Sequence, residues 1–289
     1  MDHRRFSRAT LLIAAAASML LLVPLVASAQ YGPPSAAELA ALKAAAAKPT
    51  PHTSDGHPDL NGIWFSPLTG RITGPGATKV DGNSLVINQN NPGTQTPKPL
   101  QAEDPNRPPY KTELLAKIFD LDVHQVERDP AWGCKNPGIP RLGSPHQIIQ
   151  TPGQVVFLYS DWSGGYFRVI PTDGRPHNRD LDETYMGDAV AKWDGDTLVV
   201  ESTNFTDDSW IADNGMFHST EMRVTERLRR EGDVLHYQAV VEDPVVLTKP
   251  WPLPARNLLV QTEPIQEPPP CQERDREHLV NLDHHGNPR

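Results

Sequence analysis

Residues 189–203 read AVAKWDGDTLVVEST, and this stretch carries the strongest signal for the fold. Two runs rich in apolar and β-branched residues, 189–193 and 196–203, stand on either side of Asp194-Gly195. An Asp-Gly pair between two such runs is the strongest short-range signal of a β-hairpin, because glycine adopts the positive φ angles that tight hairpin turns require. The stretch therefore predicts two antiparallel strands.

Similar runs follow one another along the second half of the chain. From residue 146 onward, apolar residues recur mainly at every second position, which is the period of a β-strand. Residues typical of turns separate the runs, and Glu231-Gly232 stands between the two longest. Besides the two strands above, the predicted strands are residues 146–150, 153–160, 165–171, 216–230, 233–243, 245–249 and 257–262, and, earlier in the chain, 62–66 and 84–88.

Short connections make consecutive strands antiparallel, and a long series of such strands closes into a barrel or folds into two packed sheets. Several runs are apolar on both faces: Leu198 and Val200 face one way and Val199 the other. Strands of this kind need cover on both sides. We therefore expect a mainly β fold, an antiparallel lipocalin-like barrel with one packed helix and long Pro/Gly-rich loops. A two-sheet β-sandwich is the alternative.

One internal segment has helical periodicity. In residues 111–129, KTELLAKIFDLDVHQVERD, apolar residues recur at intervals of three and four. Thr112 is expected to cap the start of the helix and Pro130 to end it. We expect its apolar stripe to pack on the sheet.

The amino-terminal residues have the pattern of an export signal. Residues 4–8 contain three arginines, a long apolar run follows, and Ala27-Ser28-Ala29 is a small-residue cleavage site. An uncleaved membrane anchor is the alternative, because the apolar run is long enough to span a bilayer. The Sec and twin-arginine routes both remain open. We expect a periplasmic or secreted protein with a signal peptide over residues 1–29, a leader or linker over 30–59, a single barrel-like domain over 60–280 and a polar tail over 281–289.

The chain has two cysteines, Cys134 and Cys271. In an exported chain an even number of cysteines favours a disulfide over a catalytic thiol. In the chain-entropy model, closing so long a loop would stabilise the fold by about 4–5 kcal/mol.

Charge and motifs exclude several classes of function. The formal net charge is −9, and an acidic protein repels phosphate backbones and anionic lipid surfaces. We therefore expect no nucleic-acid partner and no stable membrane insertion after cleavage of the signal. The sequence has no Gly-x-Ser-x-Gly elbow, zincin motif, EF-hand loop, P-loop or dinucleotide fingerprint, so we expect neither a cofactor nor a metal.

Some segments are similar to known families. PDLNGIW (58–64) resembles the Gly-x-Trp opening strand of lipocalin-like barrels. TPGQVVFLY (151–159), TDGRPH (172–177), TYMGDAVAKWDGDTLVVES (184–202), the His218-Ser219 step and VTERLRR (224–230) resemble a large group of secreted bacterial proteins of undefined function. Members of that group more often carry His-Ser where this chain has Asp188-Ala189. The resemblance covers roughly residues 55–280, and it implies export and one domain but no particular activity.

Polar residues on the predicted strands mark a candidate site. Alternation puts Tyr166 and Arg168 on one face of their strand and Phe167 on the other. A long polar side chain on a strand covered on both sides needs an internal partner, and Glu201 is one candidate partner for Arg168. Each histidine alone has an ordinary structural interpretation as a hydrogen-bonded residue. The residues expected to line or close one cavity are His146, Tyr166, Arg168, His177, Tyr185, Glu201 and His218.

A mostly apolar cavity with a few converging polar groups is the usual site for a small molecule. We therefore expect the protein to bind a small apolar or amphipathic molecule. The alternative is a cofactor-independent lyase, isomerase or hydratase, because imidazole titrates near neutral pH and Arg or Tyr can stabilise negative charge. In that case His218 or His177 would act as the general base.

Overall fold

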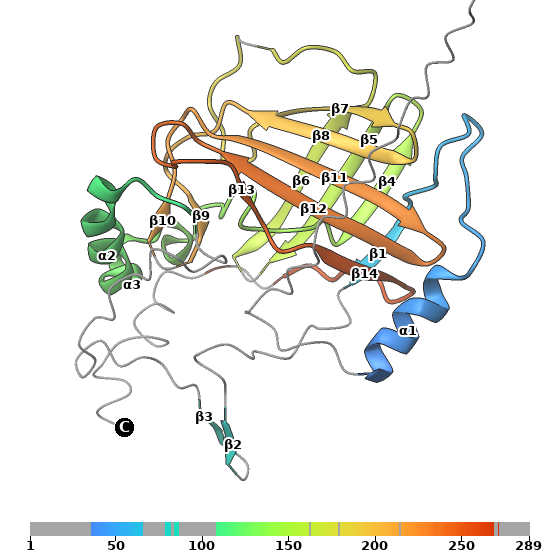
Figure 1. Ribbon diagram of the computed structural model, residues 1–289, viewed down its shortest axis with the longest axis horizontal. Coiled ribbons are helices and arrows are strands. Elements are labelled where there is room, and N and C mark those ends of the chain that lie inside the picture. Colours follow the sequence, from blue (N-terminus) through green and yellow to red (C-terminus); the bar gives the residue numbers. More distant parts are fainter. Residues whose placement is uncertain are drawn as a thin grey trace, which may run out of the picture.

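The computed structural model describes residues 36–65, 79–81, 84–86, 108–161, 163–178, 180–213, 215–268 and 271. The predicted signal peptide, residues 1–29, and the predicted tail, residues 281–289, lie outside these ranges. The described residues form a nearly closed antiparallel β-barrel, with helix α1 at one end and α2 and α3 at the other (Figure 1). The prediction of a mainly β antiparallel barrel is confirmed.

The barrel sheet is built from strands of two to nine residues. Its strands are β1 (Gly62–Phe65), β4 (Gln147–Thr151), β5 (Gln154–Asp161), β6 (Gly164–Pro171), β7 (Asp188–Asp194), β8 (Thr197–Thr203), β11 (Arg223–Glu231), β12 (Val234–Glu242), β13 (Trp251–Pro252) and β14 (Arg256–Gln261). Two separate ribbons pair β2 (Lys79–Asp81) with β3 (Ser84–Val86) and β9 (Trp210–Ala212) with β10 (Met216–Phe217).

The strand order is β6-β5-β4-β1-β14-β12-β11-β8-β7, and β13 pairs with β12 off this path. The first and last barrel strands along the chain, β1 and β14, pair with each other in the middle of the sheet. They join the β4–β6 hairpins to the strands β7, β8, β11 and β12. In Figure 1 the two groups face each other across the barrel interior.

The edge strands β6 and β7 lie next to each other and leave a seam in the barrel. Every neighbouring pair in the strand order is antiparallel, and an even number of such steps separates β6 from β7. The two edge strands therefore run in the same direction. Parallel neighbours cannot be joined by a tight turn, so residues 172–187 return along the barrel between them.

Glycines stand in two of the tight hairpin turns. Gly195 and Gly232 both have φ of +58°, a conformation that costs glycine little. The registers pair Asp194 with Thr197 and Glu231 with Val234, which leaves two residues in each turn. Both hairpins predicted from the sequence are present.

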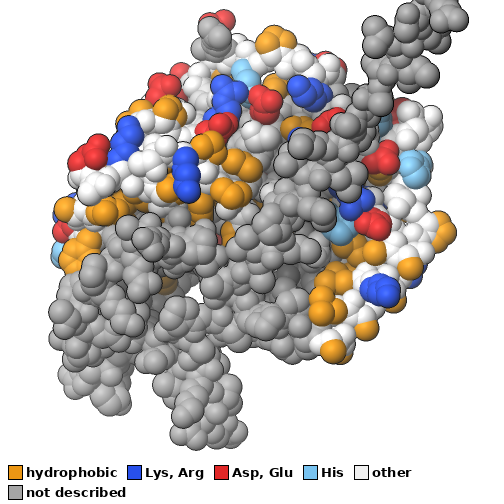
Figure 2. Space-filling view, viewed as in Figure 1, with side chains coloured by type: hydrophobic (Ala, Val, Ile, Leu, Met, Phe, Trp, Pro, Cys, Tyr) orange, Lys and Arg blue, Asp and Glu red, His pale blue; other side chains and the backbone are white. Residues whose placement is uncertain are grey.

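Alternation decides which side chains enter the barrel. Along β11, Val224, Glu226 and Leu228 are fully buried, and Arg227 on the other face is exposed. The outer surface of β7, β8 and β11 carries interspersed acidic and basic side chains (Figure 2), among them the ion pair between Arg227 and Asp194. The interior is packed with large side chains, including Trp64, Phe157, Tyr159, Leu198 and Leu228.

The internal helix is shorter and more broken than predicted. A 3₁₀ turn at Thr112–Leu114 leads into α2 (Leu115–Val123), and α3 (Gln125–Arg128) follows. The break occurs at His124, whose ψ of 30° is not helical. Thr112 is not the cap, because Lys111 takes that position without a side-chain hydrogen bond. The helix was expected to pack on the sheet with its apolar stripe. Ile118 is buried in the core, but the main strand contact of α2 is with β10 of the separate ribbon, and Phe119 and Val123 are exposed.

Two predicted strands are interrupted by turns that side chains stabilise. Residues 216–230 were expected as one strand, but a turn separates β10 from β11, in which Glu221 N–H donates to Ser219 Oγ at 3.2 Å and Met222 N–H donates to the backbone carbonyl of Ser219. Residues 245–249 form a turn instead of a strand, because the Asp243 carboxylate accepts hydrogen bonds from the N–H groups of Val245 and Val246. The nearby strand is β13, at Trp251–Pro252.

Helix α1 (Ala36–Ala46) belongs to the predicted leader and has no buried residue. Its carboxyl end contacts the β11–β12 turn: Asp233 N–H donates to Ala45 O, and Lys48 pairs with the Asp233 carboxylate at 2.6 Å. Among the described helices, none combines the length and the apolar character needed to cross a membrane.

Cys134 and Cys271 form a disulfide, with their Cα atoms 5.6 Å apart. Cys134 follows a short 3₁₀ helix (Pro130–Gly133), and the bond ties the end of the described chain to this segment. The predicted pairing of the two cysteines is confirmed.

Candidate functional site

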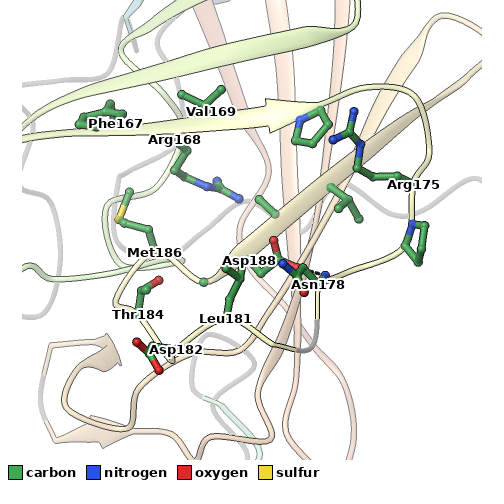
Figure 3. A pocket seen from close by; sticks show the side chains of 15 residues that line it. Phe167, Arg168, Val169, Arg175, Asn178, Leu181, Asp182, Thr184, Met186 and Asp188 are labelled. Carbon is green, nitrogen blue, oxygen red and sulfur yellow. Dashed lines mark hydrogen bonds between the residues drawn. The ribbon is translucent and has the colours of Figure 1, made fainter.

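A cavity of about 590 Å³ lies at the seam between β6 and β7 (Figure 3). It is bordered by residues of both edge strands and of the segment 172–187 that crosses between them. The topology explains this location, since the seam is the place where the barrel sheet ends on both sides. The cavity lies within the range typical of small-molecule sites, about 300–1,000 Å³.

Most of the cavity wall is apolar. Phe167 and Val169 contribute the outer side of β6, and Leu181 and Met186 contribute the crossing segment. Phe167 is 67% exposed and Val169 52% exposed. Large apolar side chains at this level of exposure, beside a hollow, are typical of a binding surface.

The part of the crossing segment that borders the cavity is held in place by the residues after β8. Asn204 has φ of +62°, and its side-chain amide donates to the carbonyls of Leu181 and Asp182, at 2.9 Å each. Thr184 N–H donates to Asn204 O at 3.1 Å. Gly187, with φ of +68°, packs so closely that a Cβ there would lie 2.6 Å from Thr203 O. These contacts to the backbone fix the position of this part of the cavity wall.

Arg168 borders the cavity and carries a positive charge. Its side chain lies on the inner face of β6. Its Nη1 donates to Glu226 Oε2 at 2.6 Å and to the Tyr159 hydroxyl at 3.2 Å, and its Nη2 donates to Ser202 Oγ at 2.6 Å. Tyr237 donates from its hydroxyl to Glu226 Oε1 at 3.1 Å. These groups form a hydrogen-bonded network inside the barrel, and Arg168 connects it to the cavity.

The network holds a buried ion pair. Burial opposes the charge of Arg168, but the neighbouring Glu226 carboxylate and Tyr159 hydroxyl raise the pKa of the guanidinium above its ordinary value. Burial raises the pKa of Tyr159, and burial together with Glu226 raises that of Tyr237. Both phenols therefore stay protonated at neutral pH and can donate hydrogen bonds.

One nitrogen of Arg168, Nε, makes no hydrogen bond to the described part of the chain. The residue is 4% exposed, and its Nε–H has no hydrogen-bond partner within the described ranges. In Figure 3 the side chain leaves β6 on the side opposite Val169 and extends into the space between β6 and the segment carrying Met186 and Asp188.

His177, in the crossing segment, contacts Asp188, the first residue of β7. His177 Nδ1 lies 3.0 Å from Asp188 Oδ2, which also accepts the N–H of Asn178 at 2.9 Å. A carboxylate only accepts hydrogen bonds, so Nδ1 of His177 carries the proton. Asp188 borders the cavity directly, and the pair sets an imidazole beside a carboxylate at the edge of the wall.

Three other predicted residues lie around the barrel without bordering the cavity. Tyr166 shares the Arg168 face and donates to Ser163 O at 3.1 Å. Tyr185 donates to the Asp208 carboxylate at 2.9 Å. His146 accepts the N–H of Ser160 at Nδ1 and lies near the Tyr159 ring; burial lowers the pKa of its imidazole.

Glu201 is not in the site, and the expected Arg168–Glu201 pair is wrong. Glu201 faces outward on β8 and lies 3.4 Å from Arg223, because its neighbours Val200 and Ser202 take the buried face. Arg168 pairs instead with Glu226, which alternation on β11 turns inward.

His218 is buried but is separate from the cavity and the Arg168 network. Its Nε2 lies 2.8 Å from Ser209 Oγ, and its Nδ1 lies 3.0 Å from Ser219 O. A carbonyl oxygen only accepts, so the proton is on Nδ1 and Ser209 donates to Nε2. Burial lowers the pKa of His218.

The polar residues that sequence reasoning missed are Tyr159, Asp188, Ser202, Glu226 and Tyr237. A signal was present for Glu226: it alternates with Val224 and Leu228, so a carboxylate stood on an apolar face. For Tyr159 the signal was its alternation with Phe157. Asp188 gave no signal, because its partner His177 lies across a loop.

Within the described ranges, no group of three or more His, Cys, Asp or Glu side chains is arranged to hold a metal ion. Comparisons of the chain with models of known families, with curated proteins and with solved structures find no match.

Proposed function

We propose that the protein binds a small, mainly apolar molecule in the seam cavity between β6 and β7. The observation that carries this proposal is the cavity itself, whose wall is mainly apolar and has polar side chains, among them Asp182 and Asp188, at its border. The apolar surface supplies affinity, because its burial removes it from water, and the polar groups orient the ligand.

The test uses the neutral fluorescent probe N-phenyl-1-naphthylamine, whose emission rises in an apolar site. We expect saturable binding to the unaltered protein. Leu181→Ser should weaken binding about tenfold, or about 1.4 kcal/mol, because it replaces an apolar side chain of the cavity wall by a polar one. Val245→Ser is the matched control, since Leu181 and Val245 are both 49% exposed and Val245 lies outside the cavity. Equal affinities for the two variants would place the probe elsewhere and contradict the proposal.

Acid–base catalysis is a second candidate function, and the His177–Asp188 pair favours it. A carboxylate that holds an imidazole in one tautomer at the edge of a cavity is an arrangement that a general base requires. Asp188→Asn would then abolish turnover of a molecule from the host extract, followed by mass spectrometry, while probe binding persists. Unchanged turnover in this variant would exclude the pair as the base.

We also propose that the protein acts in the periplasm or outside the cell. The signal-like residues 1–29 and the disulfide both support this location, because disulfides persist in oxidising compartments. Amino-terminal sequencing of the protein from its host should find Gln30 first. Recovery of the chain with Met1 intact from the cytoplasm would contradict this proposal.

A further inference from the structure

The outer face of β1, β4, β5 and β6 carries no charged side chain. Its outward residues occupy the odd positions of β1, β4 and β6 and the even positions of β5, as their exposure shows. None of these positions, all within the described ranges, holds Asp, Glu, Lys, Arg or His. The outer surface of β7, β8 and β11 differs, because it carries Lys192, Glu201 and Arg227 among other charges. We call the first surface the uncharged face.

Apolar side chains lie next to one another across the uncharged face. The register places Val169 of β6 beside Val156 of β5, and Val156 beside Ile149 of β4. In the next row Phe167 lies beside Leu158. Side chains directly opposite each other on neighbouring strands are about 5 Å apart, so these residues form one continuous patch. Continuous apolar patches on a protein surface mark sites of interaction.

Much of this patch is exposed. The large apolar residues of the uncharged face that are exposed are Phe167 (67%), Val169 (52%), Phe65 (46%) and Ile149 (39%). Residues near the end of the described chain cover one end of the face, where Ser160 Oγ donates to Gln266 O. The four apolar side chains remain exposed all the same.

The size of the uncharged face fits a contact between two molecules. At about 200 Å² for a fully exposed phenylalanine and somewhat less for isoleucine and valine, the four exposed residues offer roughly 350 Å². Two copies would bury roughly 700 Å² there, and specific interfaces begin at about 1,200 Å². The half-buried apolar residues and Gln147, Thr151 and Gln154 of the same face have to supply the remainder, roughly 250 Å² per copy.

Charge narrows the choice of what covers this face. The chain has a formal net charge of −9, so it repels anionic proteins and anionic lipid surfaces. A basic protein would find no carboxylate on the uncharged face to pair with. The covering surface must therefore be uncharged and apolar itself. A second copy of this chain brings such a surface, since in a two-fold dimer each copy contributes the same residues.

We propose that the protein forms a two-fold symmetric dimer through the uncharged face. This inference goes beyond the binding function and does not depend on it. Phe167 and Val169 belong both to this face and to the wall of the seam cavity, so the second copy lies against the outer side of the cavity. An interface near the lower size limit should be weak, with a dissociation constant in the micromolar range.

Sedimentation velocity of the unaltered protein from about 1 to about 200 µM should show a monomer that converts to a dimer. Ile149→Lys should raise the dissociation constant about hundredfold, because a two-fold contact contains the substitution twice and each buried ammonium costs about tenfold. Phe119→Lys is the matched control: Phe119 is 36% exposed and lies on α2, outside the face. Its dissociation constant should change less than about twofold. Ile149 does not border the seam cavity, so Ile149→Lys should bind the fluorescent probe normally.

Hydroxyl-radical footprinting locates the contact on the unaltered protein. Oxidation of Phe65 and Phe167 should fall several-fold between the dilute monomer and the concentrated dimer, and oxidation of Phe119 should not change. This measurement decides alone if Ile149→Lys does not fold.

A protein that is monomeric at every concentration would overturn the proposal. Binding of such a monomer to vesicles of neutral phosphatidylcholine would identify a lipid surface as the occupant of the face instead. A dimer that persists in folded Ile149→Lys, or in which Phe167 stays as reactive as in the monomer, would place the contact elsewhere and overturn the proposal as well. In each of these cases the proposed binding of a small molecule in the seam cavity would still stand.

Discussion

Arg168 is a charged side chain in the interior of the barrel, and its position follows from strand alternation on β6. Ile170, two residues further on, is also fully buried, and Val169 between them is exposed. The buried charge is tolerated because Glu226, Tyr159 and Ser202 all receive hydrogen bonds from it. A buried ion pair adds little net stability, but removing one partner leaves the other charge without compensation.

Glu226→Gln should therefore destabilise the protein by about 3–5 kcal/mol, because the buried guanidinium loses its counter-charge. Glu201→Gln is the matched control on the adjacent strand β8: Glu201 faces outward and pairs with Arg223 at 3.4 Å, so its loss should cost less than about 1 kcal/mol. Urea denaturation gives both values. Similar losses of unfolding free energy in the two variants would show that Arg168 and Glu226 do not form a buried ion pair.

His218 should make the stability depend on pH. Burial lowers the pKa of the folded-state imidazole, so near the unfolded value of about 6.5 the unfolded chain binds protons that the folded chain does not. The free energy of unfolding should be highest above that value and should fall as the pH drops from it through the folded pKa. His146, whose pKa is lowered for the same reason, adds to this fall.

Denaturation midpoints between pH 8 and pH 5 measure this dependence. His218→Gln should flatten the fall. A slope that stays the same in His218→Gln would mean that His218 is not the titrating group.

At the scale of elements, the two glycine turns have the same backbone conformation but different surroundings. Gly195 and Gly232 both have φ of +58°. A Cβ at Gly195 would meet nothing within 4 Å, whereas a Cβ at Gly232 would contact Ala45 O and lie 2.8 Å from Lys48 O. The β11–β12 turn is thus also the docking point of α1, and the β7–β8 turn is free of such contacts.

Gly195→Ala should cost about 1–2 kcal/mol, which is the strain of a side chain in the left-handed region. Gly232→Ala should cost more, because it adds the collision with the carboxyl end of α1. Thermal unfolding compares the two variants directly, and faster proteolysis between residues 36 and 50 in Gly232→Ala would confirm that α1 has separated from the turn. Equal costs would show that α1 contributes nothing at this contact.

At the scale of the whole molecule, the barrel is completed by contacts between distant parts of the chain. The first and last barrel strands, β1 and β14, pair in the middle of the sheet. The edge strands β6 and β7 run in the same direction, and the segment between them borders the cavity. The disulfide closes a separation of 137 residues between Cys134 and Cys271.

Replacing both cysteines by serine should lower the free energy of unfolding by about 4–5 kcal/mol, because the unfolded chain regains the entropy that the cross-link removes. Urea denaturation with and without reductant measures the loss. Reductant should destabilise the unaltered protein by a similar amount and leave the double variant unchanged. A double variant as stable as the oxidised protein would contradict the entropic account.

The sequence alone predicted the features that depend on neighbouring residues. The Asp-Gly and Glu-Gly turns, the alternation that buries Arg168 and the pairing of the only two cysteines all follow from residue type and local spacing. The same local reasoning predicted strands over 216–230 and 245–249, where the side chains of Ser219 and Asp243 stabilise turns instead. Such side-chain-to-backbone bonds compete with the sheet, and alternation alone does not reveal them.

Only the tertiary structure decided where the candidate site lies and which residues share it. Alternation turned Arg168 inward, but the register between strands determined that it meets Glu226 on β11 and not Glu201 on β8. The cavity exists because closure of the barrel places β6 beside β7, and His177 meets Asp188 only because the intervening segment folds back. These contacts join residues far apart in the chain, and their energies depend on the packing of the whole barrel, which no single stretch of sequence encodes.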